Sequence, residues 1–202
     1  MSDKAIILID GGYYDYINDF YRDEVNSNGI DIYQLSLYIC DWFDVKLLRT
    51  KFYHTLPYMD DEPTEEQKAR RRSQQSFFDT LDSKRKCQFE EKGRVKRDHA
   101  DCPECGEHFR TKSQKGTDVG IAVDLVEMAC DRNAPDAFIL ISGDEDLKHA
   151  VRAAKDNHAN VFLGYAYKPS HDLYSAQELR NEVDHKMNIA TANFLPDIVL
   201  DH

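Results

Sequence analysis

The sequence predicts an α/β fold, a three-layer α/β/α sandwich in which helices cover both faces of a central, mostly parallel β-sheet. Two short apolar runs, Ala5–Ile9 and Ala137–Ile141, have the length and composition of buried strands. Amphipathic segments with helical periodicity separate them from a third strand-like run, Asn160–Tyr165. Strands and helices that alternate in this way form parallel sheets, because each crossover helix packs back onto the sheet.

Local signals place the elements of the N-terminal half. Asp10-Gly11-Gly12 predicts a tight turn after the first strand, and the aromatic-rich stretch Tyr13–Tyr21 predicts the start of a helix. Asp31 precedes the amphipathic run Ile32–Phe43 and is expected to cap that helix. The remaining expected elements are a strand over 47–55 and a helix over about 63–81, with a proline in its first turn.

The C-terminal half continues the alternation. The expected elements are a strand over 86–96, a helix over 116–129 and, capped by Asp144, a helix over 145–156. The tail from about residue 172 holds a helical stretch near Ala176 and then a weakly patterned end. This tail could dock on the core or on a partner subunit, so a homodimer is an open possibility.

Length and composition define the class of protein. The 202 residues suffice for a single domain over 1–202, which we expect to carry a small insertion over 86–114. Hydrophobic residues make up 41% and charged residues 31%, as in soluble globular proteins. No apolar run reaches the ~18 residues that a membrane-spanning helix needs. The N-terminus has the pattern of a strand and not of a signal peptide, and five cysteines are too few for a secreted disulfide framework. A cytoplasmic location is therefore expected.

The charges are unevenly distributed along the chain. The formal net charge is -11, which by itself argues against a general nucleic-acid-binding protein. Residues 68–115, however, hold 14 basic and 8 acidic side chains, whereas the rest of the chain holds 12 basic and 29 acidic ones. The basic segment is either a solvated helix and hairpin or a positive flank that holds phosphates beside an acidic site.

Four aspartates are predicted to meet at one edge of the sheet. Asp10 and Asp144 each follow an apolar strand, Asp146 lies two residues after Asp144, and Asp118 lies in the first turn of a predicted helix. Because the carboxyl ends of parallel strands share one edge, these side chains should converge there. Carboxylates this close repel one another unless a cation lies between them, and hard oxygen ligands suit Mg²⁺ or Mn²⁺. Such ions can activate water for phosphodiester hydrolysis.

Each aspartate also has a purely structural explanation. Asp144 could serve only as an N-cap, Asp118 only as a helix-dipole residue and Asp10 only as a turn residue. Their joint occurrence at strand ends favours the metal site. Asp124 lies six residues after Asp118, about 240° around a helix, so it is expected to face elsewhere, in a salt bridge.

Three segments of the sequence resemble the motifs of the NYN domains of the LabA-like group, which belong to the PIN-like nuclease superfamily. They are Leu8–Tyr13, Lys115–Val119 with Ile121–Leu125, and Ile141–Leu147. The stretch Phe52–His54 followed by Leu56–Tyr58 also resembles the second strand of the group and its following loop. The resemblance implies a PIN-like fold and a Mg²⁺- or Mn²⁺-dependent ribonuclease site at Asp10, Asp118, Asp144 and Asp146.

One residue departs from the pattern of the group. Many relatives carry Asn shortly after the first Asp-Gly, where this chain has Tyr13. The first hypothesis is an endoribonuclease acting on RNA, with single-stranded DNA as an alternative substrate. The second is a weakly active or inactive RNA-binding or regulatory module of the same fold, which the Tyr13 departure and the acidic overall charge favour. A small-molecule phosphatase is a third hypothesis, which the Lys115–Asp118 motif does not support.

A cysteine pair predicts a second metal site. Cys102-Pro-Glu-Cys105 has the spacing of a zinc knuckle, and its polar, basic flanks argue against a redox pair. His99 and His108 lie three residues to either side and would complete four ligands for a structural zinc ion. Cys87 is the rival ligand, although its alternation with a phenylalanine fits a core position equally well.

Further residues are expected to contact the substrate. The zinc-pinned hairpin would bring Lys96 and Arg97 near the acidic edge, and Lys115 would position a phosphate there. Tyr13 could stack on a base or lie in the core. The hydroxyl of Ser142 could hold a water or a phosphate oxygen.

Overall fold

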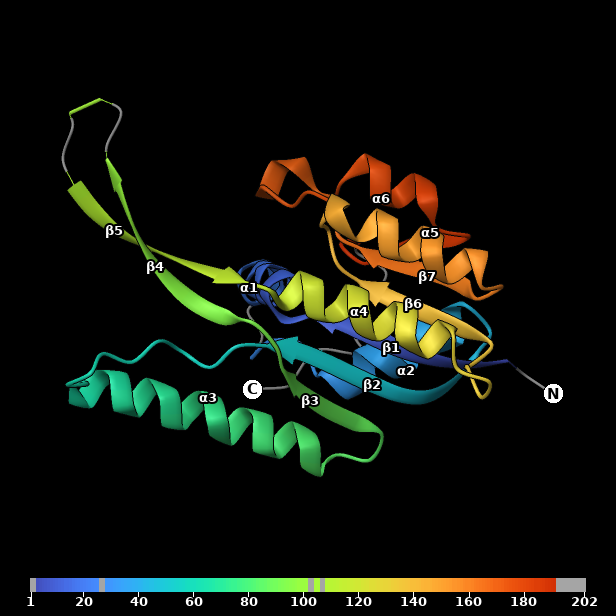
Figure 1. The fold of residues 1–202 in the computed structure, drawn as a ribbon, viewed down its shortest axis with the longest axis horizontal. Coiled ribbons are helices and arrows are strands. Elements are labelled where there is room, and N and C mark those ends of the chain that lie inside the picture. The colour runs from blue at the N-terminus through green and yellow to red at the C-terminus, as the bar shows by residue number, and fades with distance from the viewer. Residues whose placement is uncertain (1–2, 26–27, 102–103, 106–107, 192–202) are drawn as a thin grey trace.

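A computed structural model describes residues 3–25, 28–101, 104–105 and 108–191. The centre is a six-stranded, fully parallel sheet with the strand order β3-β2-β1-β6-β7-β8 (Figure 1). Its strands are β1 (Lys4–Asp10), β2 (Lys46–His54), β3 (Cys87–Glu91), β6 (Ala137–Ile141), β7 (Asn160–Tyr165) and β8 (His185–Asn188). A separate antiparallel hairpin consists of β4 (Arg94–Asp101) and β5 (His108–Lys115).

Helices cover both faces of the sheet, which confirms the predicted α/β class and its mostly parallel sheet. One layer contains α1 (Gly11–Val25), α2 (Ile32–Trp42) and α3 (Glu65–Ser83). The other contains α4 (Thr117–Ala129), α5 (Lys148–Asp156) and α6 (Gln177–Glu182), with short 3₁₀ turns at Glu145–Leu147 and Pro169–His171. Two hydrophobic clusters result because successive side chains of each strand point to opposite faces, as Ile7 and Leu8 do.

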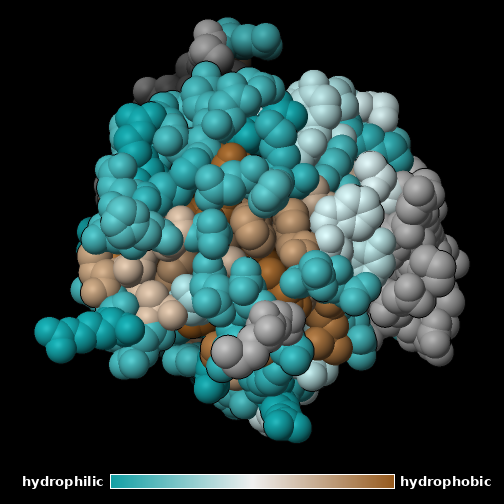
Figure 2. Space-filling model, turned by 90° about the vertical axis from the view of Figure 1, so that its right-hand side faces the viewer, coloured by the Kyte–Doolittle hydropathy of each residue, from teal (hydrophilic) through white to brown (hydrophobic). Residues whose placement is uncertain are grey.

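The strand order contains one reversal, and it lies between β1 and β6. From β1 the chain proceeds to β2 and β3 on one side, whereas from β6 it proceeds to β7 and β8 on the other. Ligands of open parallel sheets bind outside the carboxyl ends of the strands at such a reversal. Asp10 ends β1 and Asp144 follows β6, so the fold places both at this position. Figure 2 shows the opposite face of the molecule, at the amino ends of the strands, where hydrophobic side chains are exposed among hydrophilic ones.

Several predicted boundaries need correction. The strand expected over 86–96 is two strands in two sheets, because the chain breaks at Gly93. Gly93 has φ +83, and a Cβ there would lie 2.5 Å from the carbonyl oxygen of Lys115. Because Cys87–Glu91 belongs to the main sheet, the inserted hairpin is shorter than the expected 86–114 segment. The helix expected after Asp144 begins as a 3₁₀ turn, and β8 was not predicted.

No helix within the described ranges is both long enough and apolar enough to cross a membrane. The tail beyond residue 191 lies outside the described residues, so its docking on the core or on a partner stays open.

Asp31 caps α2, as expected, and gives a test of the fold. Its carboxylate accepts hydrogen bonds from the backbone amides of Tyr33 (2.8 Å) and Gln34 (3.0 Å) and pairs with Lys84. Burial raises the pKa of Asp31, but the Lys84 ammonium and the two amides outweigh burial and hold it below its ordinary value. Asp31→Ala should cost about 1–2 kcal/mol of unfolding free energy, and Asp31→Asn less, because asparagine is also a good N-cap.

The difference in unfolding free energy between wild type and Asp31→Asn measures the contribution of the Asp31 charge. A folded-state pKa below the unfolded value of about 3.9 means that the charge stabilises the fold above that value. This stabilisation is lost as the pH falls through the folded-state pKa. Urea unfolding at pH 7 and in steps below pH 4 measures it. A difference that stays constant over this range would contradict the assignment.

Candidate metal centre

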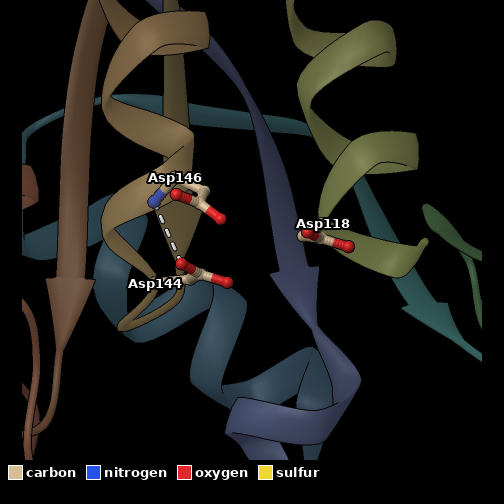
Figure 3. A group of neighbouring side chains, drawn as sticks. All are labelled: Asp118, Asp144 and Asp146. Atoms are coloured by element: carbon tan, nitrogen blue, oxygen red, sulfur yellow. Dashed lines mark hydrogen bonds between the residues drawn. The ribbon is translucent and has the colours of Figure 1, made fainter. Parts of the chain in front are cut away.

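Three of the four predicted carboxylates lie together at the carboxyl ends of the strands. One carboxylate oxygen from each of Asp118, Asp144 and Asp146 lies within 4.8 Å of the other two. Figure 3 shows Asp144 and Asp146 in the turn after β6 and Asp118 at the start of α4, on either side of β1. A single cation can therefore reach ligands from two segments that are far apart in the sequence.

The capping role of Asp144 does not compete with ion binding. Its Oδ1 accepts a hydrogen bond from the backbone amide of Asp146 at 2.9 Å, which starts the 3₁₀ turn (Figure 3). The cap uses one of the two carboxylate oxygens, so the other can serve an ion. The structural explanation of this residue and the predicted metal-binding role are therefore compatible.

The three carboxylates lack cationic partners of their own. Asp118, Asp144 and Asp146 form no salt bridge with any residue in the part of the chain that the structure describes. Like charges at this separation repel one another, and the repulsion is relieved when a cation binds between them. Carboxylate oxygens are the ligands that Mg²⁺ and Mn²⁺ prefer. The residues present therefore fit a hard divalent cation.

Asp10 lies beside this group, on the floor of the same pocket. Its Oδ1 accepts from the backbone amides of Gly12 (3.0 Å) and Tyr13 (3.4 Å), and its Oδ2 accepts from the Ser142 hydroxyl (3.4 Å). Burial raises the pKa of Asp10; the three hydrogen bonds oppose this rise, and the negative charge of Asp144 adds to it. The structure does not place Asp10 within the three-carboxylate group, but a cation bound there would favour its ionised form.

Ser142 connects the two strand ends. Its side chain is 1% exposed, and its hydroxyl accepts a hydrogen bond from the backbone amide of Asp144 at 3.2 Å while donating to Asp10. We expected this hydroxyl to face water or a phosphate. In the structure it links the Asp10 carboxylate at the end of β1 to the backbone of Asp144 in the turn after β6.

An open pocket of about 620 Å³ is lined by Asp10, Asp118 and Asp144. Lys115, at the end of β5, lines it together with Asp118, as the predicted phosphate contact requires. Tyr16 lines it as well and is 71% exposed. The pocket thus combines an acidic floor with a lysine and an aromatic ring, a composition that suits a nucleotide bound through a metal ion.

Tyr13 is held against the backbone at the pocket wall. Its ring packs on Gly143, where a Cβ would lie 2.5 Å from the ring. Its hydroxyl donates to the carbonyl of Ala166 (3.1 Å) and accepts from the amide of the same residue (2.7 Å). Burial raises the pKa of Tyr13 to about 12. Only the ring of Tyr13 is therefore available to a substrate. The hydroxyl connects the site to the segment after β7 through its hydrogen bonds with Ala166.

Two further residues belong to the surroundings of the site, and only the first of them was singled out from the sequence. Asp124 forms the expected salt bridge, and its partners are Lys51 (3.1 Å) and Lys92 (3.4 Å), with a hydrogen bond from the Tyr53 hydroxyl (2.9 Å). These contacts fix α4 on β2 and so position Asp118. The second feature is His54, a polar residue at the end of β2. A polar side chain at a strand end was the signal that singled out Asp10, and it applied equally to His54.

The zinc prediction falls mostly outside the described residues. Cys102 is not described, and Cys105 is exposed. The backbones of His99 and His108 belong to β4 and β5, whereas their side chains, like those of Lys96 and Arg97, are not described. Cys87 is 5% exposed and packs in the hydrophobic cluster between the sheet and α3, which matches its core interpretation.

Comparisons with known proteins agree with this geometry. A family model described as the NYN domain matches residues 4–190. The structure is similar to the crystal structure of a protein of unknown function from Vibrio parahaemolyticus, with a TM-score of 0.56 and 21% sequence identity over 98% of this chain and 97% of that chain. At this identity the likeness shows the fold alone. A comparison with curated proteins found no match. The LabA-like group stays a prediction.

Proposed function

The chain belongs to the NYN domain family, whose fold is that of PIN-like nucleases, and we propose that it is a metal-dependent endoribonuclease. The observation that carries this proposal is the group formed by Asp118, Asp144 and Asp146, in which one oxygen from each residue lies within 4.8 Å of the others and which forms no ion pair with the residues that the structure describes. The group lies at the carboxyl ends of β1 and β6, where the strand order reverses. Such a reversal is the binding position of open parallel sheets.

Each residue then has a defined task. Asp118, Asp144 and Asp146 would hold Mg²⁺ or Mn²⁺, which when bound supplies water activation and neutralises the charge that develops on the phosphate. Asp10 is oriented by two backbone amides and by Ser142. It would add a fourth carboxylate beside the ion, where it could accept a proton or contact the ion. Lys115, which lines the same pocket, would bind the phosphate.

The basic segment supplies the attraction that the acidic remainder lacks. Residues 68–115 carry a net charge of +6 and include α3 after its first turn and the β4–β5 hairpin, which projects from the carboxyl edge (Figure 1). A polyanion guided by this segment would reach the carboxylates with its charge partly neutralised. RNA is the proposed substrate, and single-stranded DNA is the alternative that the assay below separates from it.

A weakly active RNA-binding module of the same fold is the second candidate. The observation that favours it is Tyr13, whose hydroxyl is engaged by the backbone of Ala166 and cannot replace the amide contact of an asparagine. Under this alternative the protein would bind RNA at the same pocket and cleave it slowly or not at all.

The test is cleavage of an RNA and a DNA single strand of one sequence, in Mg²⁺, in Mn²⁺ and in EDTA. Wild type is compared with Asp118→Asn and Asp10→Asn, and with Glu127→Gln as a matched control, because Glu127 is an exposed acidic residue of the same helix as Asp118. We expect cleavage that depends on the ion, survives in the control and is lost in both aspartate variants. Equal activity in all four proteins would place the activity elsewhere, and tight binding without cleavage would favour the second candidate.

We further propose a structural zinc ion in the hairpin, held by Cys102, Cys105, His99 and His108. The support is the Cys-x-x-Cys spacing together with the antiparallel pairing of β4 and β5, because the cysteine pair lies in the connection between these strands. The purified protein should contain one equivalent of zinc that survives dialysis and disappears in the Cys102→Ser, Cys105→Ser double variant. Metal analysis decides this, and a folded wild-type protein without zinc would overturn it.

A further inference from the structure

A second pocket opens next to the carboxylate pocket, on the other side of the first turns of α1. Its volume is about 480 Å³, within the range of roughly 300–1,000 Å³ that is typical of small-ligand sites. Its walls are the end of β2 with its following loop, Asp15 of α1, and one side of α3, and Val95 of β4 closes it toward the hairpin. The predicted catalytic residues do not line it.

Gly11 lies between residues that line the two pockets. This residue directly follows Asp10, and it lies so close to β2 that a Cβ there would be 2.4 Å from the ring of His54. Gly12 and Tyr13 line the carboxylate pocket, whereas His54 and Asp15 line the second one. Both linings thus include residues of the first turns of α1, so a chain that lay across this part of the helix would contact both pockets.

His54 and Asp15 form a fixed wall. The Nε2 of His54 lies 3.1 Å from the Asp15 carboxylate, and its Nδ1 lies 2.7 Å from the carbonyl of Thr55. Burial lowers the pKa of His54, but its hydrogen bonds and the charges of Asp15 and Asp10 outweigh burial and raise it above the ordinary value. Because the two side chains are paired with each other, the wall can face a neutral group such as a base or a sugar.

The side chains with unused hydrogen-bonding capacity come from α3. Glu66, Arg70 and Gln74 follow one another at four-residue spacing, so they lie on one side of the helix, and all three line the pocket. None of the three side chains forms a hydrogen bond or an ion pair with a residue in the described ranges. A guanidinium, a carboxylate and an amide together offer donors and acceptors that match the edge of a base and a phosphate.

The helix that carries these side chains is held in place. Thr64 and Gln67 form a capping box at its start, Gln67 also donates to Asp60 at 2.7 Å, and Arg71 donates to the carbonyl of Pro57 at 3.3 Å. The pocket is thus a preformed feature of the fold and not a gap beside a loosely packed helix. Preformed pockets bind with less loss of conformational entropy.

We propose that this pocket binds one unpaired nucleotide of the nucleic-acid strand whose adjacent phosphate lies at the carboxylates. The inference rests on the proposed function, because it extends the substrate from the carboxylate pocket across Gly11. It also implies a preference for single strands, since a base within a duplex hides the edge that Arg70 and Gln74 would contact.

The test measures binding in a background that does not cleave, so that it stands apart from activity. Asp118→Asn protein in Mg²⁺ is titrated with a labelled RNA single strand and with a duplex of the same sequence. Arg70→Gln and Gln74→Ala are added singly to this background. Arg72→Gln is the matched control, because it removes the same charge from an exposed position of α3 that does not line the pocket.

We expect each pocket variant to weaken single-strand binding about tenfold or more, as the loss of a base-edge contact does. The control should stay within about twofold, and duplex binding should change equally in Arg70→Gln and Arg72→Gln, which remove the same charge. Equal weakening by Arg70→Gln and Arg72→Gln would mean that only the overall charge of α3 matters, and it would overturn the inference. A complete absence of single-strand binding would overturn it as well. Wild-type cleavage with unchanged binding in the pocket variants would overturn the inference alone. Weakened binding without any wild-type cleavage would overturn the nuclease proposal alone.

Discussion

Asp144→Asn should leave the metal-free protein at least as stable as wild type, yet remove most of the stabilisation that Mg²⁺ or Mn²⁺ provides and lower cleavage about 100-fold or more. The two effects have opposite signs because one carboxylate serves two purposes. Without an ion it repels Asp118 and Asp146, whereas with an ion it is a ligand. A residue that acted only as a cap would show neither effect.

The substitution is chosen to preserve local structure. Asparagine caps helices about as well as aspartate, so the hydrogen bond from the Asp146 amide is retained. Removing one of three neighbouring charges that solvent reaches should then raise the metal-free unfolding free energy by up to about 1 kcal/mol. Alanine at this position would lose the cap as well and would confuse the two contributions.

The ion-dependent part can be measured without any substrate. A ligand present at a hundredfold excess over its dissociation constant stabilises the folded state by about 2.7 kcal/mol. Thermal unfolding of wild type in EDTA and in saturating Mg²⁺ or Mn²⁺ should show a gain of this order, and Asp144→Asn should show less than half of it. Glu127→Gln should behave as wild type does. An undiminished gain in Asp144→Asn would remove this residue from the ligand set.

The parts of the fold that could be predicted are those in which a local pattern determines the structure. Strands β1, β6 and β7 are buried on both faces, so each is a short apolar run that ends in a turn signal. The aspartates at these strand ends follow from the same pattern, because parallel strands share their carboxyl edge. This is why the sequence groups Asp10 with Asp144, whereas Asp118 joins them from the start of α4.

The parts that could not be predicted depend on distant pairing. β8 is a four-residue edge strand in which only Met187 is buried, so its sequence has no strand pattern, and its pairing with β7 defines it. His54 acquires its position from the close approach of β1 to β2 at Gly11. Ser142 was expected to face a substrate, and only the pairing of β1 with β6 turns its hydroxyl toward Asp10.

Gly11→Ala should be the most damaging small substitution near the site. Its Cβ would lie 2.4 Å from the ring of His54 and 2.6 Å from the carbonyl oxygen of Tyr53, which belongs to a fully buried strand residue. Because Tyr53 is fully buried, β2 has no room to move, so the first turn of α1 must move away from β2. Overpacking of this kind costs about 1–3 kcal/mol, and we expect the upper end because a backbone atom is involved.

Gly164→Ala is the matched control, because it adds the same methyl group at a buried position that has room. The nearest atom to its Cβ would be Cγ1 of Ile141 at 3.4 Å, an ordinary contact. This variant should be neutral or more stable by about 0.4–1 kcal/mol, since alanine restricts the unfolded chain. Urea unfolding of both variants at pH 7 measures the difference, and equal stabilities would show that β1 and β2 do not meet as tightly as the structure indicates.

The Gly11 variant also separates packing from function. Movement of the first turn of α1 carries Gly12 and Tyr13 with it, and both donate their backbone amides to Asp10. It also displaces Asp15 from His54, which together form the wall of the second pocket. Gly11→Ala should therefore weaken both the ion-dependent stabilisation and single-strand binding, whereas Gly164→Ala should change neither. A Gly11→Ala protein that is destabilised but binds ion and single strand normally would mean that the two pockets do not depend on this turn, and that the strand does not cross it.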